Sequence, residues 1–420
     1  MSIAHGTPTC PASRLSPGLL IVSAATVLTI TMGVRQTLGL FVLPLHHSFG
    51  LGIASISFAM AIGQLIWGVV QPCFGALADK CGSYRVIVLG AVLLSAGFAL
   101  TPVASSDGLL VLTIGVLAAA GAGAGSFSIL MGIAAKAIPP ERRSVAAGFI
   151  NAGGSVGQFI FAPVAQAIIA HAGWVRAMLT MSVAALCTIP MAWPLRHDAK
   201  PVLPPGTGAE QSMGKRIVRA LHDPSYLCLH AGFFTCGFHV AFLITHLPGE
   251  VALCGHSAAV SAVSIGLIGL FNIAGSLIAG ALGSWYRMKY ILALMYGSRA
   301  VMIAVFLAAP KTTLTFYVFA AALGLTWLAT VPPTAGLVGK LFGAQHLATL
   351  FGLTLLTHQI GGFLGAWLGG LVMEHSGTYQ WMWSVDIVLA SLAALVNLPI
   401  REARIARTPP ALSRQSVKVG

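Results

Sequence analysis

The chain has 420 residues, of which 57% are hydrophobic and 8% are charged, and its mean hydropathy is +0.88. Soluble domains carry about 25% charged residues, so this composition excludes an ordinary soluble protein and indicates a polytopic membrane protein. The seven cysteines form no CxxC pair, which excludes a disulfide framework and a zinc site. The formal net charge of +13 has a topological explanation, given below, and does not indicate nucleic-acid binding.

Twelve apolar segments are long enough to cross a bilayer. A polar tail, 1–17, precedes six of them, at 18–45, 53–78, 84–104, 109–135, 145–170 and 176–195. A proline-bearing polar loop, 196–224, separates these from six more, at 225–247, 258–283, 289–309, 314–338, 348–372 and 381–400, and a basic tail, 401–420, closes the chain. We therefore expect an all-α membrane protein with two six-helix bundles, 18–195 and 225–400, and a first helix that is not a cleaved signal peptide.

The two bundles repeat each other at an offset of 204 residues. Gly33-Val34-Arg35, followed by Leu43-Pro44, returns as Gly237-Phe238-His239, followed by Leu247-Pro248. Further pairs at the same offset are Lys136 and Lys340, Gly148 and Gly352, Gly157 and Gly361, His171 and His375, and Gly173 and Gly377. Parallel repeats are one architecture of secondary transporters, which bind substrate between the halves. Arg35 and His239 are then pseudo-symmetry mates expected to face a common centre.

Arg35 indicates the charge of the substrate. An arginine deep in a span costs about 3 kcal/mol on insertion scales, so it faces a protein interior or a wet cavity. All ten acidic residues except Asp386 lie at helix ends, in loops or in tails. A carrier of cations is expected to keep a carboxylate in its cavity, whereas a guanidinium can bind a carboxylate in bidentate geometry. The substrate is therefore predicted to be a small organic anion.

The basic residues set the orientation. Nineteen of the 23 Lys and Arg residues lie in the tails and in the loops after even-numbered spans. By the positive-inside rule, both termini and the central loop are expected in the cytoplasm, in a bacterial-type inner membrane.

The loop after the second span carries Gly75, Asp79, Lys80, Gly82 and Arg85 in a pattern that resembles the signature of the major facilitator superfamily. The resemblance extends to the length, the layout of six and six helices and the repeat. It implies that the aspartate and the basic residues form a cytoplasmic gate, consistent with a carboxylate stabilising a helix N-terminus. A short charged turn is the plainer alternative. Ser284 stands at the aspartate position of the second half, so a second gate motif is degenerate.

Within this superfamily the chain is similar to monocarboxylate porters and related bacterial organic-anion carriers. The similarity rests on Arg35 with Phe41, and on Ala152-Gly153-Gly154-Ser155 with Ala162-Pro163, Gln166 and Gly173-Trp174. One departure stands out, because those porters carry an Asp and an Arg four residues apart in helix 8, where this chain has Asn272 and Ser276.

Several other polar side chains within spans are candidate contacts for substrate. They are His239, Gln64, Trp67, Asn272, Trp327, His358 and Gln359. His239 and His358 are also candidates for proton coupling, because histidine changes charge in the physiological pH range. For each, hydrogen bonding between helices is the structural alternative. Arg299 is a possible buried charge, either functional or satisfied by backbone carbonyls. Pro332-Pro333 must interrupt the tenth helix, because two amide donors are missing.

These features predict a secondary active transporter that moves a small organic anion, a monocarboxylate, by alternating access, with a proton as the possible coupling ion. Two alternatives stay open: a drug or metabolite efflux antiporter, and a membrane sensor derived from a transporter. An enzyme is not indicated, because no nucleophile-base set, metal cluster or phosphate loop is evident. We expect no cofactor, no metal and no nucleic-acid partner, and a monomer in the lipid bilayer.

Overall fold

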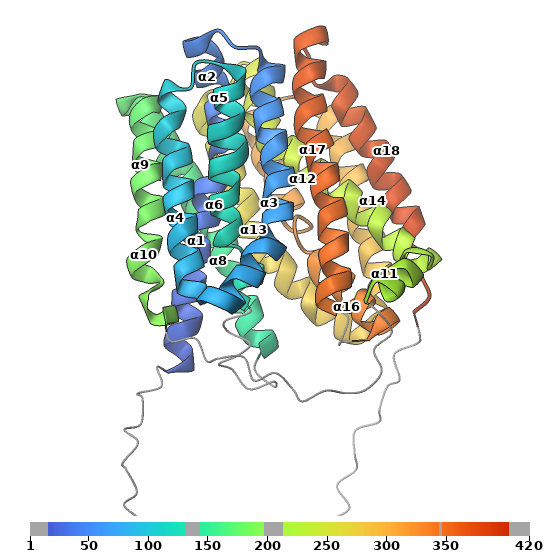
Figure 1. The fold of residues 1–420 in the computed structure, drawn as a ribbon. Helices are drawn as coiled ribbons and strands as arrows, with labels where there is room; N and C mark the ends of the chain where they lie inside the picture. Colours follow the sequence, from blue (N-terminus) through green and yellow to red (C-terminus); the bar gives the residue numbers. More distant parts are fainter. Residues whose placement is uncertain (1–15, 132–142, 197–212, 344–346, 403–420) are drawn as a thin grey trace, which may run out of the picture.

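The computed structural model describes residues 16–131, 143–196, 213–343 and 347–402, and all regular secondary structure in them is helical (Figure 1). The helices of the N-terminal half are α1 (Pro17–Gln36), η1 (Leu38–Phe41), α2 (Val42–Phe49), α3 (Ile53–Cys81), α4 (Ser83–Leu100), η2 (Thr101–Val103), α5 (Asp107–Leu110), η3 (Val111–Ala118), α6 (Ala119–Ala124), α8 (Arg143–Ala172), α9 (Trp174–Leu186), α10 (Thr188–Met191) and η5 (Trp193–Arg196). Those of the C-terminal half are α11 (Met213–Leu221), α12 (Pro224–Leu253), α13 (Ala258–Trp285), α14 (Met288–Ala308), α15 (Thr313–Gly324), α16 (Val331–Phe342), α17 (Leu347–Ser376) and α18 (Gln380–Asn397).

Within the described residues, eleven helical segments are long and apolar enough to cross a membrane, and the shorter apolar helix α15 leads through a break into α16. The prediction of twelve membrane-spanning helices is therefore confirmed. The break, at residues 325–330, directly precedes Pro332 and Pro333. Proline at the start of a helix is favourable, since its missing N–H would have no partner there anyway. The two prolines thus begin α16 and end the regular hydrogen bonding of the tenth span before it.

The repeat is visible in how helices pack within each half. In the N-terminal half α1 packs along α8, and in the C-terminal half α12 packs along α17. A Cβ atom on Gly157 would overlap the carbonyl oxygen of Thr29, and one on Gly361 would overlap that of Phe234. The matched glycines Gly157 and Gly361 therefore mark the same close crossing of two backbones, as small residues do in membrane bundles.

Small residues also pack the fourth span against its neighbours. A Cβ on Gly121 would meet the backbone of α4 at Leu94 and Gly90, and one on Gly123 would meet Val70 of α3. A π-helical turn, η3, precedes this stretch. The glycines of this span thus serve close helix packing.

The two halves meet mainly through α3 against α17 and α8 against α13. We call the side where α1 begins and α18 ends, at the bottom of Figure 1, the termini side. Contacts between the halves extend from the opposite side, where Ala54 meets Glu374, to the middle, where Gly68 packs on Gln359. On the termini side, Cβ atoms added to four glycines of these helices would meet nothing within 4 Å. These are Gly75, Gly148, Gly280 and Gly352.

Candidate functional site

Arg35 lies at the end of α1, in the middle of the N-terminal bundle. Its Nη2 donates a hydrogen bond to Oε1 of Gln64 at 2.7 Å, and its guanidinium carbon lies 4.5 Å from the centre of the Trp67 ring. Within the described chain, Arg35 has no carboxylate partner in a salt bridge. The guanidinium is therefore oriented by an amide and an aromatic face, while its positive charge stays available to an anion.

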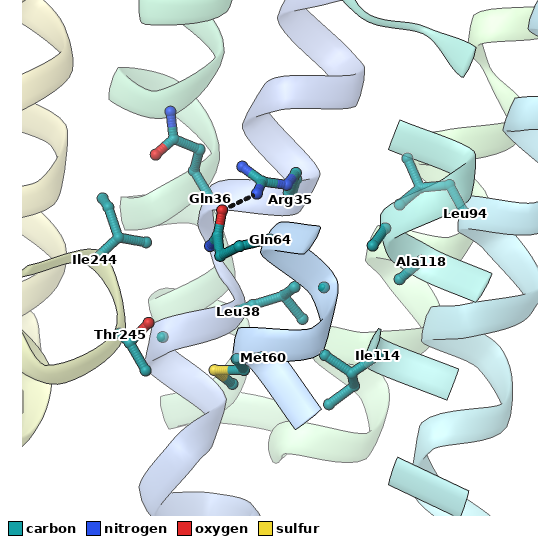
Figure 2. Close-up of a pocket in the computed structure, with 13 residues that line it drawn as sticks. Arg35, Gln36, Leu38, Met60, Gln64, Leu94, Ile114, Ala118, Ile244 and Thr245 are labelled. Atoms are coloured by element: carbon teal, nitrogen blue, oxygen red, sulfur yellow. Dashed lines mark hydrogen bonds between the residues drawn. The ribbon is translucent and has the colours of Figure 1, made fainter. Parts of the chain in front are cut away.

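A small cavity adjoins this guanidinium (Figure 2). Its volume is about 40 Å³, room for a few water molecules. It lies between α1, α3, α4, η3 and α12. The lining residues are Arg35, Gln36, Leu38, Gly39, Met60, Gly63, Gln64, Leu94, Ile114, Ala118, Ala119, Ile244 and Thr245. Most of the walls are apolar, so a carboxylate placed here would find its positive partner at Arg35 and its apolar surroundings in the aliphatic side chains.

A pair of glutamines connects the cavity to the other half of the protein. Gln36 Nε2 donates to Oε1 of Gln158 at 3.1 Å, and Gln158 Nε2 donates to the carbonyl oxygen of Ile265 at 3.1 Å. Gln158 is 1% exposed. Because Gln36 neighbours Arg35, a movement between the halves at α8 and α13 can reach the cavity through hydrogen bonds. The sequence analysis missed both glutamines, although a glutamine in an apolar span is itself a signal that a partner exists.

Asn272 lies between the halves and not in the cavity. Its Nδ2 donates to Ser155 Oγ of α8 at 2.9 Å, and its Oδ1 accepts from the backbone N–H of Leu328 at 2.9 Å. Ser276 Oγ also contacts this oxygen, at 3.4 Å. Both ends of the amide are thus engaged, one by the opposite bundle and one by the break in the tenth span.

Arg299 of α14 holds the carbonyl groups that this break leaves free. Its Nη2 donates to the carbonyl oxygens of Thr326 and Trp327, the latter at 2.6 Å, and its Nη1 lies 3.5 Å from the sulfur of Cys236. Broken helices persist at membrane depth only where neighbours satisfy the freed groups. The geometry therefore supports the structural interpretation of Arg299. Trp327 is fully buried beside it, with no exposed surface.

His239 faces the interior of the C-terminal bundle. Its Nδ1 lies 2.5 Å from Oδ2 of Asp386 on α18, and the two side chains are 1% and 0% exposed. The Trp327 ring lies 5.9 Å from the imidazole. We expected Arg35 and His239 to face a common centre. In the structure Arg35 lines the cavity and His239 does not, so their contacts do not show such a centre. The sequence analysis did not identify Asp386 as the partner of His239. An aspartate within a span needs a partner in a low dielectric, and this was the signal that could have led to the pair.

His358 and Gln359 lie on α17 near the boundary between the halves. Gln359 Nε2 is 3.2 Å from Nδ1 of His358. Gln359 packs over Gly68 of α3, and one turn away Gln64 packs on Gly362. Gln359 therefore lies across the contact between α3 and α17 from Gln64, the hydrogen-bond partner of Arg35. The His358 ring instead packs on Phe233 of α12.

The gate-motif residues cluster at the termini side of α3 and α4. Gly82 has φ +88°, a conformation that favours glycine, and forms the turn between the helices. Lys80 and Arg85 are exposed. The side chains of Asp79 and of its counterpart Ser284 lie outside the described part of the chain.

Known proteins share the sequence pattern and the helical layout of this chain. The sequence profile described as Major Facilitator Superfamily matches residues 23–366. The chain belongs to the major facilitator superfamily. Members of this superfamily are secondary carriers, so the protein is a multi-pass membrane transporter and not an enzyme.

Relatives within the superfamily span nearly the whole chain. The chain is 25% identical to the uncharacterized MFS-type transporter YcxA of Bacillus subtilis (87% of this chain, 90% of that protein) and 26% identical to monocarboxylate transporter 13 of Rattus norvegicus (91% and 88%). It is 23% identical to the oxalate:formate antiporter of Oxalobacter formigenes (92% of each).

Among solved structures, a bacterial homologue of the human lysosomal transporter Spinster superposes with a TM-score of 0.72 at 15% identity. The match covers 90% of this chain and 96% of the homologue. This likeness concerns the fold.

Proposed function

We propose that this carrier moves a small organic anion, a monocarboxylate, by alternating access. The observation that carries the proposal is the guanidinium of Arg35, which lines a mostly apolar cavity without a carboxylate partner among the described residues. An unpaired cation at this depth is costly. A bound carboxylate would neutralise it through charge-assisted hydrogen bonds.

The arrangement around Arg35 supports a ligand with one carboxylate. Gln64 and Trp67 hold the guanidinium from two sides, and the remaining walls at Met60, Leu94 and Ile114 are aliphatic. An aliphatic pocket disfavours a second charge, which would have no partner there. Similarity to proteins named monocarboxylate transporter favours the same substrate class, and similarity to an oxalate:formate antiporter favours small organic anions more broadly.

Ile244 and Thr245 of the C-terminal bundle line the cavity, and Gln359 is a further candidate contribution of that bundle to the substrate site. It lies against Gly68 on the same face of α3 that carries Gln64. Gln359, Asn272, Trp327 and His358 are candidates that a different conformation would have to expose, because each is at least nine-tenths buried in this one.

We further propose proton symport, with a histidine as the proton carrier, in a bacterial-type inner membrane with both termini in the cytoplasm. The distribution of Lys and Arg supports this orientation. The termini side is then cytoplasmic, and the gate motif lies on that face. Efflux of cationic drugs is less well supported, because Asp386, the acid that the sequence analysis placed inside a span and away from helix ends, is engaged by His239.

The test uses purified protein in liposomes and a panel of radiolabelled formate, acetate, lactate, pyruvate and oxalate. We expect saturable uptake of a monocarboxylate by the wild type and loss of at least about tenfold in kcat/KM for Arg35→Gln, since a charge-assisted contact is worth about 1.5–3 kcal/mol. Arg176→Gln, an exposed arginine of the opposite side, is the matched control and should transport normally. Export of hydrophobic cations without carboxylate uptake would overturn the proposal.

A further inference from the structure

The structure assigns the coupling proton to the buried pair of His239 and Asp386, inside the C-terminal bundle and apart from the anion cavity. This inference rests on the proposed function, and it replaces a choice between two histidines with one defined site. The pair joins α12 to α18, with Nδ1 of His239 at 2.5 Å from Oδ2 of Asp386.

The hydrogen-bonding pattern leaves the pair ready to accept a proton. When the Nδ1–H of a neutral His239 donates to the Asp386 carboxylate, the lone pair of Nε2 is free. Nε2 of His239, Oδ1 of Asp386 and Nε1 of Trp327 are buried and without a partner among the described residues. A buried polar group without a partner needs an explanation. A role in accepting a proton explains the free Nε2, because protonation converts the imidazole to an imidazolium paired with the carboxylate.

Charge balance allows the same pair to release the proton. Arg299 is part of the same core, because it donates to the carbonyl oxygen of Trp327, whose ring lies 5.9 Å from His239. With the proton absent, the carboxylate of Asp386 keeps the hydrogen bond from Nδ1–H of His239, and the cationic Arg299 lies in the same bundle. With the proton present, the imidazolium of His239 and the carboxylate of Asp386 form an ion pair, so the added charge is not isolated in a low dielectric, which would be prohibitively costly.

Other titratable groups surround this core on α12, α14, α17 and α18. They are Cys236 of α12, Tyr296 and Arg299 of α14, His358 of α17 and Asp386 of α18. Among them Asp386 is the carboxylate, and His239 is its partner. His358 instead contacts the amide of Gln359.

Two further histidines, the buried His246 and the half-buried His230, show why the carboxylate matters. His230 and His246 also leave one ring nitrogen without a partner in the described structure. Their other nitrogens contact the hydroxyl of Thr357 and the carbonyl oxygen of Ala366, at 2.6 and 2.7 Å. A neutral partner does not stabilise an imidazolium as a carboxylate does, so these two are not assigned a proton.

Helix α12 physically joins the proton site to the anion cavity. Ile244 and Thr245, which line the cavity, follow His239 by about one and a half turns, or roughly 8 Å along the helix. The backbone at Ile244 packs directly on Gly39, where a Cβ atom would overlap its carbonyl oxygen. A displacement of α12 upon protonation therefore moves a wall of the cavity, which provides a mechanical route for coupling.

The first test separates exchange from accumulation in proteoliposomes. Asp386→Asn and His239→Gln are expected to retain carboxylate counterflow within about threefold of the wild type, while accumulation under an inward proton gradient falls to the equilibrated level. His246→Gln, a buried histidine on the same helix with a neutral partner, should keep gradient-driven accumulation. Full accumulation by Asp386→Asn would overturn the assignment, and so would a parallel loss of both reactions together with thermal stability.

A second test needs no variant. Proton uptake by the wild type on adding lactate is followed with a pH indicator in weakly buffered detergent solution. Uptake of about one proton per bound anion is expected. Carboxylate transport without proton uptake would overturn the inference and the proposed symport, and would leave the proposed anion transport standing.

An infrared titration covers the case in which no carboxylate is transported. A carboxyl or imidazolium signal that titrates in the wild type and is absent in Asp386→Asn supports the proton site whatever the substrate. Identical titration of the two proteins would remove it.

Discussion

Oε2 of Glu374 accepts a hydrogen bond from the backbone N–H of Ala54 at 2.9 Å, and this contact links the C-terminal bundle to the N-terminal one. Glu374 lies near the end of α17, and Ala54 belongs to the first turn of α3, on the side opposite the termini. The first N–H groups of a helix have no intrahelical partner and carry partial positive charge, so a carboxylate there is stabilising. The contact therefore joins the two bundles on that side of the protein.

Removing this carboxylate is expected to open the side opposite the termini more often. Glu374→Ala should increase the labelling rate of Ser57→Cys by a membrane-impermeant maleimide about two- to fivefold in a background without other cysteines. Ser57 is a good reporter because it is 0% exposed and contacts Gly370 across the boundary. His375→Ala is the matched control, since His375 bonds only within its own helix. An unchanged labelling rate would show that the contact does not hold the closed state.

Glycines matched by the repeat should differ in tolerance according to what surrounds them. Gly157→Ala and Gly361→Ala force a Cβ atom into a neighbouring backbone, and we expect a loss of about 1–3 kcal/mol in stability. Gly148→Ala and Gly352→Ala, in the same two helices, face open space. They should be neutral or stabilising by about 0.5–1 kcal/mol. Thermal melting in detergent distinguishes the two pairs, and equal melting temperatures would contradict the packing shown here.

Arg299 is expected to affect stability more than substrate affinity. Arg299→Gln leaves the carbonyl groups of Thr326 and Trp327 without strong donors, at a cost of about 1–3 kcal/mol for each. Expression and melting temperature should therefore fall, while the KM of the folded fraction changes less than twofold. Arg287→Gln, at the start of α14, is the control. A stable Arg299→Gln protein with greatly raised KM would instead make Arg299 part of the substrate site.

A carboxylate built beside Arg35 should act as a tethered competitor for the anion. Gln64 Oε1 already lies 2.7 Å from the guanidinium, so Gln64→Glu is expected to neutralise it and to weaken carboxylate binding by at least about tenfold, given 1.5–3 kcal/mol for such a contact. Gln64→Leu should cost less. Gln71→Glu is the control for added charge, because Gln71 lies about two turns further along α3 and accepts a hydrogen bond from Ser128. Binding assays on the purified proteins provide the measurement.

The number of helices, the repeat and the break in the tenth span could be predicted from the sequence, because each depends on the residues of one segment or on their order along the chain. A bilayer requires a minimum apolar length for each span, and prolines lack the donor that a helix interior needs. The offset of 204 residues likewise paired Gly157 with Gly361, and the structure then showed that both lie at close backbone crossings. The chain by itself thus determined the architecture and the position of each polar residue along its helix.

Tertiary structure alone decided what each polar residue faces. Arg35, His239 and Arg299 all read as basic groups within apolar spans. The packing orients Arg35 to an aliphatic cavity, His239 to Asp386 on α18, and Arg299 to the carbonyl groups of a broken helix. Position along a helix follows from the sequence, but the partner across a helix boundary depends on rotation and crossing angle, which are set by the side chains of several helices packed together.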